Sequence, residues 1–336
     1  MSTTPRRRRL ADRVTALAAG MAVPSLLDVG YGLAASPERG GTAGSHTGAA
    51  ADGGGRRPSS PRSAQKPAAK AWLMLPATPA LPKADASGTV EVNGTGIFHA
   101  VYGAGPAVVM LHGGLGSSNY WGHQISALSP RHRVIAIDTR GHGRSPVTSN
   151  AFSYDLFARD VLAIMDRLGV GQAALVGWSD GGVTALQLAM LRPDRVSGAF
   201  LFGANADPSG YIPGGASRSS VFRAYVARCN AEYRKLSPTP ARLGELTAGL
   251  RRMWRSEPRF TRAMLARTKV SVTVAHGAHD EIIRREHASY IASAIPGARL
   301  AVLPGVSHFA MLQQPQEFNA ALQAFFDGGP AVAGRP

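Results

Sequence analysis

The stretch Gly177-Trp178-Ser179-Asp180-Gly181 decides the fold that this sequence predicts. It stands between an apolar, strand-like run at residues 173–176 and a helix-like run that opens at Gly182. A serine on a sharp turn from a strand into a helix has a strained backbone, and its hydroxyl stands above the edge of the sheet. The residues two before and two after it approach so closely that only glycine fits at both places. The pattern therefore predicts a reactive, accessible serine at position 179.

Short apolar runs alternate with helix-length amphipathic segments over most of the chain. Runs in which polar residues do not alternate with apolar ones are typical of strands that are covered on both faces of the sheet. Strands that alternate with helices indicate a mainly parallel α/β sheet with right-handed crossovers. A hairpin is expected first, with strands at 89–92 and 97–102 joined by Asn93-Gly94. Further strands are expected at 107–111, 134–137, 173–176, 198–202, 270–275 and 300–303, and helices at 156–168 and 183–191.

Two segments depart from this alternation. Residues 211–269 contain about three helical patterns without a strand run, and they follow the sixth expected strand when the hairpin is counted as two. We expect them to form a helical cap over the carboxyl ends of the strands, where open α/β sheets bind ligands. Residues 1–87 are rich in Gly, Pro, Ser and Ala, a composition that predicts a disordered tail. The α/β core is expected to comprise residues 88–210 and 270–330.

The formal net charge of +16 is concentrated in the same two segments. Residues 1–87 carry 12 Lys and Arg against 5 Asp and Glu, and residues 211–269 carry 13 against 3. Neither segment contains a recognisable nucleic-acid-binding module. We therefore expect solvated basic faces and no nucleic-acid partner.

The N-terminus leaves the cellular compartment open. Four arginines at positions 6–9 precede a moderately apolar run at 14–27, an outline that resembles an export signal. Charged residues interrupt the start of that run, and a second signal-like stretch follows at 71–81. Neither run is long enough to span a membrane as a helix. The sequence favours the cytoplasm, or export if the first run is a signal peptide. The single cysteine, Cys229, excludes an internal disulfide, and nothing in the sequence indicates the oligomeric state.

A serine hydroxyl is a weak nucleophile near neutral pH, so it needs a histidine base that a carboxylate orients. After a turn of this kind, the acid and then the histidine are expected to follow the serine along the chain. Asp280 follows the strand at 270–275, and His308 follows the strand at 300–303, each in a glycine-containing turn. We predict Ser179 as the nucleophile, His308 as the base and Asp280 as the acid, with Asp207 and Glu281 as alternative acids.

The negative charge that develops on a reacting carbonyl oxygen requires N–H donors aimed at it. One is expected from the backbone of Asp180, and the other from the loop at 112–116, at Gly114 or Leu115. That loop lacks the Gly-Lys-Ser/Thr ending that a phosphate-binding loop requires. Four aromatic residues are expected as walls of a substrate pocket: Trp121, Trp178, Trp254 and Phe309.

Five motifs, which occur in order between residue 88 and about residue 327, resemble those of the α/β-hydrolase superfamily. The chain is most similar to the capped, carboxylesterase-like branch of that superfamily, which includes enol-lactonases and carbon–carbon bond hydrolases. The resemblance implies a triad of Ser179, Asp280 and His308 under a helical cap, with no metal and no organic cofactor. The motifs are the stretches 112–114, 138–145, 177–181, 277–280 and 305–308.

A serine nucleophile favours acyl chemistry, so we predict a serine hydrolase that cleaves a small carboxylic ester or lactone. The same residues also fit a cofactor-free perhydrolase or a carbon–carbon bond hydrolase, and the fold can serve as a ligand receptor with vestigial catalysis. Two features make opposite predictions about substrate charge. The Asp180 carboxylate would hold an ammonium group, whereas the positive charge of residues 211–269 would attract an anion.

Overall fold

The computed structural model describes residues 70–149 and 151–328. Its centre is an eight-stranded sheet with the order β1-β2-β4-β3-β5-β6-β7-β8. The pairs β1/β2 and β2/β4 are antiparallel, and all other neighbours are parallel. The predicted α/β-hydrolase fold, with its mostly parallel sheet, is thereby confirmed. The strands are β1 (Ala86–Val92), β2 (Thr95–Tyr102), β3 (Ala107–Leu111), β4 (Arg133–Ile137), β5 (Ala173–Trp178), β6 (Val196–Phe202), β7 (Val272–Gly277) and β8 (Arg299–Leu303).

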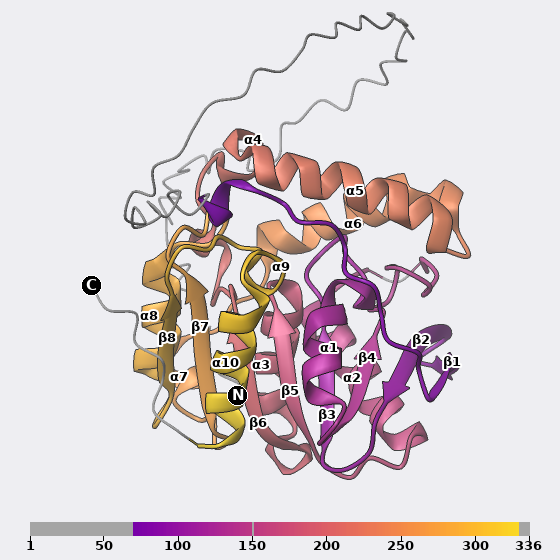
Figure 1. Ribbon diagram of the computed structural model, residues 1–336, viewed down its shortest axis with the longest axis horizontal. Helices are drawn as coiled ribbons and strands as arrows, with labels where there is room; N and C mark the ends of the chain where they lie inside the picture. Colours follow the sequence, from indigo (N-terminus) through magenta and orange to yellow (C-terminus); the bar gives the residue numbers. More distant parts are fainter. Residues whose placement is uncertain (1–69, 150, 329–336) are drawn as a thin grey trace, which may run out of the picture.

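Helices cover both faces of the sheet (Figure 1). On one face α1 packs against α10, and on the opposite face α3 packs against β5, β6 and α2. The helix α8 packs against β7 and β8. These helices of the core are α1 (Gly122–Leu128), α2 (Tyr154–Arg167), α3 (Asp180–Leu191), α8 (Arg285–Ala294), α9 (Ala310–Gln313) and α10 (Pro315–Phe326), with short 3-10 helices η2 (Ser118–Trp121) and η3 (Pro193–Arg195).

Most elements differ from the expected bounds by a few residues at one or both ends, and in two of them the neighbouring residues explain an extension. The strand β7 ends at Gly277 and not at residue 275, because His276 and Gly277 pair with Val302 and Leu303 of β8. The helix α3 begins directly after Ser179, because the N–H of Val183 donates to the carbonyl of Ser179 at 3.0 Å. The added residues are His276 and Gly277 in β7 and residues 180–182 in α3. They do not continue an apolar run, so the sequence pattern does not predict them.

The chain between β6 and β7 forms a helical insertion, whose two long helices lie across the carboxyl-terminal edge of the sheet (Figure 1). Each has one apolar face at helical spacing, which explains why the insertion packs on the core. The helix α5 buries Val221, Tyr225, Cys229 and Tyr233, and α6 buries Leu246, Leu250 and Met253. The elements of the insertion are η4 (Pro208–Gly210), α4 (Gly215–Arg218), α5 (Ser220–Leu236), η5 (Pro240–Arg242), α6 (Leu243–Ser256) and α7 (Arg262–Leu265).

The prediction of a disordered tail up to residue 87 is wrong for residues 70–87. This segment starts with the 3-10 helix η1 (Ala71–Leu73), runs on extended, and enters β1. Its backbone carbonyls accept hydrogen bonds from the helices that it crosses. Arg228 of α5 donates to the carbonyl of Pro76 at 2.6 Å, and Gln313 of α9 donates to the carbonyl of Met74 at 2.9 Å. The segment therefore joins the insertion to the core.

The side chains of the same segment also pack. Leu75 and Leu81 lie against the main hydrophobic core, and the ring of Trp72 stacks on His279 with the centroids 4.0 Å apart. The composition of the segment does not predict these contacts, because the residues that it contacts are distant in the sequence. Residues 1–69, which include the outline of an export signal, lie outside the described residues. Within residues 70–149 and 151–328, the structure contains no helix of sufficient length and apolar character to cross a membrane.

Candidate active site

Ser179 joins β5 to α3 in a backbone conformation that residues other than glycine rarely adopt, with φ 54° and ψ −120°. The turn is held by a hydrogen bond from the N–H of Ser179 to the carbonyl of Phe202 on β6, at 2.8 Å. A Cβ at Gly177 would lie 2.6 Å from the Cα of Gly182, and a Cβ at Gly181 would lie 2.7 Å from the carbonyl oxygen of His112. The turn therefore needs glycine on both sides of the serine, as the sequence predicts.

Asp280 and His308 meet after the strands β7 and β8. The distance from His308 Nδ1 to Asp280 Oδ2 is 2.8 Å, and both side chains are almost completely buried. The other carboxylate oxygen, Oδ1, accepts hydrogen bonds from the N–H groups of Ile282 and Ile283 at 2.9 and 2.8 Å. The carboxylate is thus fixed from two sides, and it engages Nδ1 of the imidazole.

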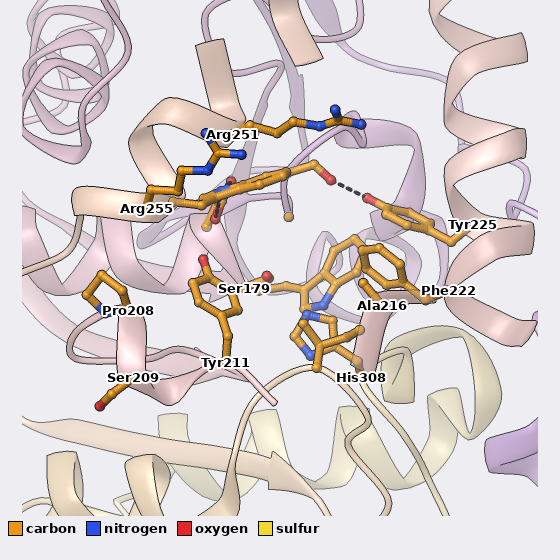
Figure 2. A pocket seen from close by; sticks show the side chains of 16 residues that line it. Ser179, Pro208, Ser209, Tyr211, Ala216, Phe222, Tyr225, Arg251, Arg255 and His308 are labelled. Carbon is orange, nitrogen blue, oxygen red and sulfur yellow. Dashed lines mark hydrogen bonds between the residues drawn. The ribbon is translucent and has the colours of Figure 1, made fainter. Parts of the chain in front are cut away.

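The imidazole of His308 lies over the end of β6, the strand next to the one that carries Ser179. A Cβ at Gly203, the residue after β6, would lie only 2.8 Å from His308 Cε1 and 3.0 Å from Nδ1. Ser179 and His308 line the same cavity (Figure 2). Because Asp280 occupies Nδ1, Nε2 is the ring nitrogen left for proton transfer in that cavity.

The two alternative acids have other roles in the structure. Asp207 caps η4, where its carboxylate accepts a hydrogen bond from the N–H of Ser209 at 2.8 Å. Glu281 accepts from the backbone N–H of His308 at 3.2 Å and from the hydroxyl of Ser219 at 3.2 Å. Of the three carboxylates considered, Asp280 is the one that contacts the imidazole.

Charges around His308 determine its protonation. Burial alone would lower the pKa of His308, but the negative charge of Asp280 and its hydrogen bond, followed by the charges of Glu281 and Asp180, raise it above the ordinary value of 6.5. Burial raises the pKa of Asp280, yet His308 and the N–H donors around the carboxylate outweigh this effect, and the net shift is downward. Asp280 therefore remains ionised beside the histidine.

The two predicted N–H donors flank the turn at Ser179. Asp180 is the first residue of α3, where backbone N–H groups have no partner within the helix. Gly114 lines the cavity, and its carbonyl accepts a hydrogen bond from the Tyr225 hydroxyl at 2.8 Å. A Cβ at Gly114 would lie 2.6 Å from Trp254 Cζ2, so a larger residue at this position would displace the Trp254 side chain. The next residue, Leu115, has φ 68°, which marks a tight loop.

The side chain of Asp180 is buried and bonded. Its carboxylate accepts hydrogen bonds from the Tyr154 hydroxyl at 2.8 Å and from Trp254 Nε1 at 2.9 and 3.0 Å. Burial raises the pKa of Asp180 to about 6, against the opposing effect of these two bonds and of the charge of His308. Near neutral pH the carboxylate is thus close to its titration range.

The cavity has a volume of about 500 Å³ and lies between the sheet edge and the insertion. Trp178 and Trp254, two of the four aromatic residues expected to line a substrate pocket, line this cavity. The prediction is wrong for Trp121 and Phe309, which are fully buried behind the wall. Trp121 packs against Phe318 of α10, and Phe309 packs against Tyr225. Residue type alone cannot separate a pocket wall from the core behind it. The insertion and the loop after β6 contribute Pro208, Ser209, Tyr211, Ala216, Phe222, Tyr225, Arg251 and Arg255 (Figure 2).

Sequence reasoning missed three residues that shape this site: Gly203, Tyr154 and Tyr225. Gly203 directly follows a covered strand, a position at which a glycine signals a close approach, so its role could have been found. The two tyrosines reach the site from α2 and α5, and only the tertiary structure brings them there.

Replacement of Gly203 by alanine is expected to lower kcat/KM about 10²-fold, because the added methyl group displaces the imidazole from its position. The φ of +63° adds a loss of stability of about 1–2 kcal/mol. Gly169→Ala is the matched control, since Gly169 has φ +65° and no atom within 4 Å of the new methyl group. Steady-state kinetics and thermal unfolding of both variants test this expectation. Equal activity of the two variants would mean that the methyl group leaves His308 in place.

Comparison with known proteins identifies the family. The profile of the alpha/beta hydrolase fold family matches residues 106–231. The serine hydrolase BPHL of Homo sapiens is 30% identical over 255 residues, an alignment that covers 71% of this chain and 86% of BPHL. The chain belongs to the α/β-hydrolase family. It is accordingly a hydrolase of the α/β fold.

Solved structures also resemble this chain over about 70% of its length. Est816, described as an N-acyl homoserine lactone degrading enzyme, is 27% identical with a TM-score of 0.62, and the match covers 71% of this chain and all of Est816. The enol-lactonase from Burkholderia xenovorans LB400 is 25% identical with a TM-score of 0.58, and the match covers 71% of this chain and all of the lactonase.

Proposed function

We propose that this hydrolase cleaves a small carboxylic ester or lactone through an acyl-enzyme on Ser179. The observation that carries the proposal is the 2.8 Å contact between Asp280 and His308 Nδ1, with the imidazole over Gly203 beside the strand of Ser179. This arrangement leaves Nε2 as a base in the cavity that holds the serine. A nucleophile, a base and an orienting acid are the parts that acyl transfer requires.

In the proposed mechanism the Ser179 oxygen attacks the carbonyl carbon while His308 Nε2 takes the hydroxyl proton. The carbonyl oxygen becomes an oxyanion, which accepts hydrogen bonds from the N–H groups of Gly114 and Asp180; each such donor contributes about 10²–10³ in rate. The intermediate collapses, and His308 protonates the departing alcohol oxygen. A water molecule, deprotonated by His308, then attacks the acyl-enzyme. As this second intermediate collapses, His308 returns that proton to the departing Ser179 oxygen, which releases the carboxylic acid and restores the free serine.

The placement of α5 and α6 supports a role as a cap. They form much of the cavity wall opposite Ser179, and closure of such a cavity excludes bulk water and strengthens the electrostatic interactions inside it. The similarity to a serine hydrolase and to two lactone-degrading enzymes supports ester or lactone chemistry.

A panel of acyl esters and lactones, assayed with the purified protein and its Ser179→Ala variant, tests the proposal. We expect turnover that depends on Ser179, and covalent labelling of Ser179 by a fluorophosphonate probe. Tight retention of a lactone without turnover, together with no labelling, would contradict the proposal and favour a ligand receptor.

The charge of the substrate is tested separately, because both acidic and basic side chains line the cavity. Asp180 lines it together with Arg251 and Arg255 of α6, and the two arginines are labelled in Figure 2. Matched cationic, neutral and anionic esters are compared at two salt concentrations. Faster turnover of the cationic ester indicates an ammonium site at Asp180, whereas salt-sensitive preference for the anionic ester indicates the arginines. Equal rates would eliminate both hypotheses.

The pH dependence of kcat/KM should report the ionisation of His308. The base must be neutral to accept the serine proton, so activity falls as the pH drops through the pKa of His308. Because that pKa is raised, the acid limb should have its midpoint above 6.5. Glu281→Gln removes a charge that raises the pKa but keeps an acceptor for the His308 N–H, and it should move the midpoint to lower pH. Asp207→Asn is the control. A midpoint that Glu281→Gln leaves unchanged would contradict this account.

A further inference from the structure

The loop after β3, residues 112–116, contains the proposed oxyanion donor Gly114 and two further glycines. The N–H of Gly116 donates to the carbonyl of Gly113 at 3.1 Å, and Leu115, the third residue of this turn, has φ 68°. A four-residue turn with that hydrogen bond and a positive φ at its third residue is a type II turn, in which glycine is the usual third residue. Leucine adopts this conformation at a cost in free energy, so contacts from outside the loop must stabilise it.

Such a contact comes from the helical insertion. The hydroxyl of Tyr225 on α5 donates a hydrogen bond to the carbonyl of Gly114 at 2.8 Å (Figure 2). Gly114 is the second residue of the turn, so its carbonyl belongs to the peptide group whose orientation distinguishes a type II from a type I turn. The bond therefore holds this peptide in the orientation that gives Leu115 its positive φ. In a trans peptide the N–H points opposite to the carbonyl, so the N–H of Leu115 faces away from Tyr225, which favours Gly114 as the oxyanion donor.

The side chain of Tyr225 is fixed in position and remains a donor. It is 2% exposed, and its ring packs against Trp178 and Phe309, with the centroids 5.5 and 5.0 Å apart. Burial raises the pKa of Tyr225 well above its ordinary value of 10, so the hydroxyl keeps its proton throughout the neutral range. Trp178 directly precedes Ser179, so the tyrosine packs beside the turn that carries the nucleophile.

The helix that carries Tyr225 is itself anchored to the rest of the molecule. Arg228 of α5 donates to a backbone carbonyl of the segment 70–87 at 2.6 Å. Glu232, one helical turn further on, accepts from the hydroxyl of Thr78 in the same segment at 2.6 Å. The position of the Tyr225 hydroxyl relative to the loop therefore depends on the placement of α5.

We propose that Tyr225 is a positioning residue for the oxyanion hole: from α5 it holds the loop in the turn that aims the N–H of Gly114 at the reacting carbonyl oxygen. This inference rests on the proposed acyl transfer at Ser179. Without the hydroxyl, the peptide between Gly114 and Leu115 can rotate to the type I form, in which Leu115 has the negative φ that leucine favours. The rotation changes ψ of Gly114, so its N–H is no longer held in one direction. The loss should appear in the transition state, because negative charge develops on the oxygen only there.

Tyr225→Phe tests the inference, because it removes the hydroxyl and retains the packed ring. Complete loss of an oxyanion donor lowers kcat about 10²–10³-fold, so a donor that is present but no longer held in place should cost about tenfold. KM should stay within about twofold of wild type, and the midpoint of the acid limb should not move, because His308 is unaffected. Tyr233→Phe is the matched control. Tyr233 is also a buried residue of α5, and its hydroxyl donates to the carbonyl of Thr239 at 3.0 Å, away from the residues that line the cavity. It should keep the kcat of wild type.

Two ketone inhibitors separate the transition state from the substrate complex. The Ser179 oxygen adds to a trifluoromethyl ketone while His308 takes the hydroxyl proton, and the adduct places an oxyanion in the hole. The matching methyl ketone binds as a neutral carbonyl compound. In Tyr225→Phe the inhibition constant of the trifluoromethyl ketone should rise about tenfold, in proportion to the loss in kcat, whereas that of the methyl ketone should stay unchanged.

Gly116→Ala perturbs the same hydrogen bond from the side of the loop, so the test does not depend on the folding of one variant. A Cβ at Gly116 would lie 2.8 Å from the Tyr225 hydroxyl, so the methyl group should displace the hydroxyl and lower kcat in the same way. In a Tyr225→Phe background it meets no hydroxyl, and the double variant should lie within about twofold of Tyr225→Phe alone. Losses that multiply would mean that the two residues act independently and would contradict the inference.

Hydrogen exchange at the amides of residues 112–116 separates the loop from the chemistry, because it requires no substrate. We expect faster exchange there in Tyr225→Phe and unchanged exchange in Tyr233→Phe. If exchange responds in this way but wild type hydrolyses no ester, the role of Tyr225 in the loop stands and the proposed function fails. A loss in kcat without faster exchange would mean that the hydroxyl acts directly on the substrate, and it would overturn the inference. So would an unchanged kcat in Tyr225→Phe, or a loss that a shift of KM or of the acid limb accounts for.

Discussion

Replacement of Ser179 by alanine is expected to lower kcat for ester hydrolysis by about 10⁶-fold. Without the hydroxyl there is no covalent route, and His308 has no serine proton to accept. His308→Ala should cost about as much, and the double variant should be no worse than either single variant, because the two side chains act as a unit. A residual acceleration of about 10³–10⁴ over water is expected from substrate binding and the oxyanion donors.

Steady-state kinetics with one good ester of the panel measure these losses. Ser209→Ala is the control, since Ser209 lines the same cavity but lies outside the turn after β5, and its hydroxyl contacts His287 at 3.2 Å. We expect it to keep activity within a few-fold of wild type. If the losses in Ser179→Ala and His308→Ala multiplied in the double variant, the two residues would act independently and the proposed mechanism would be wrong.

Asp280→Asn should lower kcat by about 10⁴-fold while it preserves the fold. An asparagine retains the shape of the side chain and an oxygen for the N–H groups of Ile282 and Ile283. It can, however, present an NH₂ group to His308 Nδ1, which favours the tautomer with the proton on Nε2. That tautomer cannot accept the serine proton. The asparagine also carries no charge to stabilise the imidazolium that forms when Ser179 attacks.

The matched variants for this prediction are Asp207→Asn and Glu281→Gln. Asp207 caps η4, and its replacement should change kcat little. Glu281 accepts a hydrogen bond from the backbone N–H of His308, and its replacement should have a small effect that depends on pH. Circular dichroism and thermal unfolding show whether each variant is folded. A larger loss in either of these variants than in Asp280→Asn would assign the acid elsewhere.

The core could be predicted because its signals are local. Each covered strand is a short apolar run, and the turn at Ser179 requires glycine at 177 and 181 for steric reasons that involve neighbours in the sequence and one adjacent strand. Asp280 and His308 follow Ser179 along the chain because each stands shortly after a strand, and β7 and β8 come after β5 in the sequence. Such features depend on the local geometry of the backbone, so the pattern of nearby residues is sufficient to predict them.

The surroundings of the site could not be predicted in the same way. Trp121 and Phe309 have the same apolar character as Trp178 and Trp254, and only packing decides which of them faces the cavity. The segment 70–87 has the composition of a tail, yet Arg228 and Gln313, more than 150 residues away, hold it. These outcomes depend on contacts between distant parts of the chain.

By itself the sequence determined the α/β architecture, the strained turn at Ser179 and the identity of the side chains that could act with it, because short-range sterics and apolar periodicity fix these features. The tertiary structure decided which acid meets His308, which aromatic rings line the cavity, and that the hydroxyl of Tyr225 on α5 reaches the carbonyl of Gly114. The physical reason is that burial and contact are properties of the packed molecule. An individual residue acquires them only when remote segments close around it.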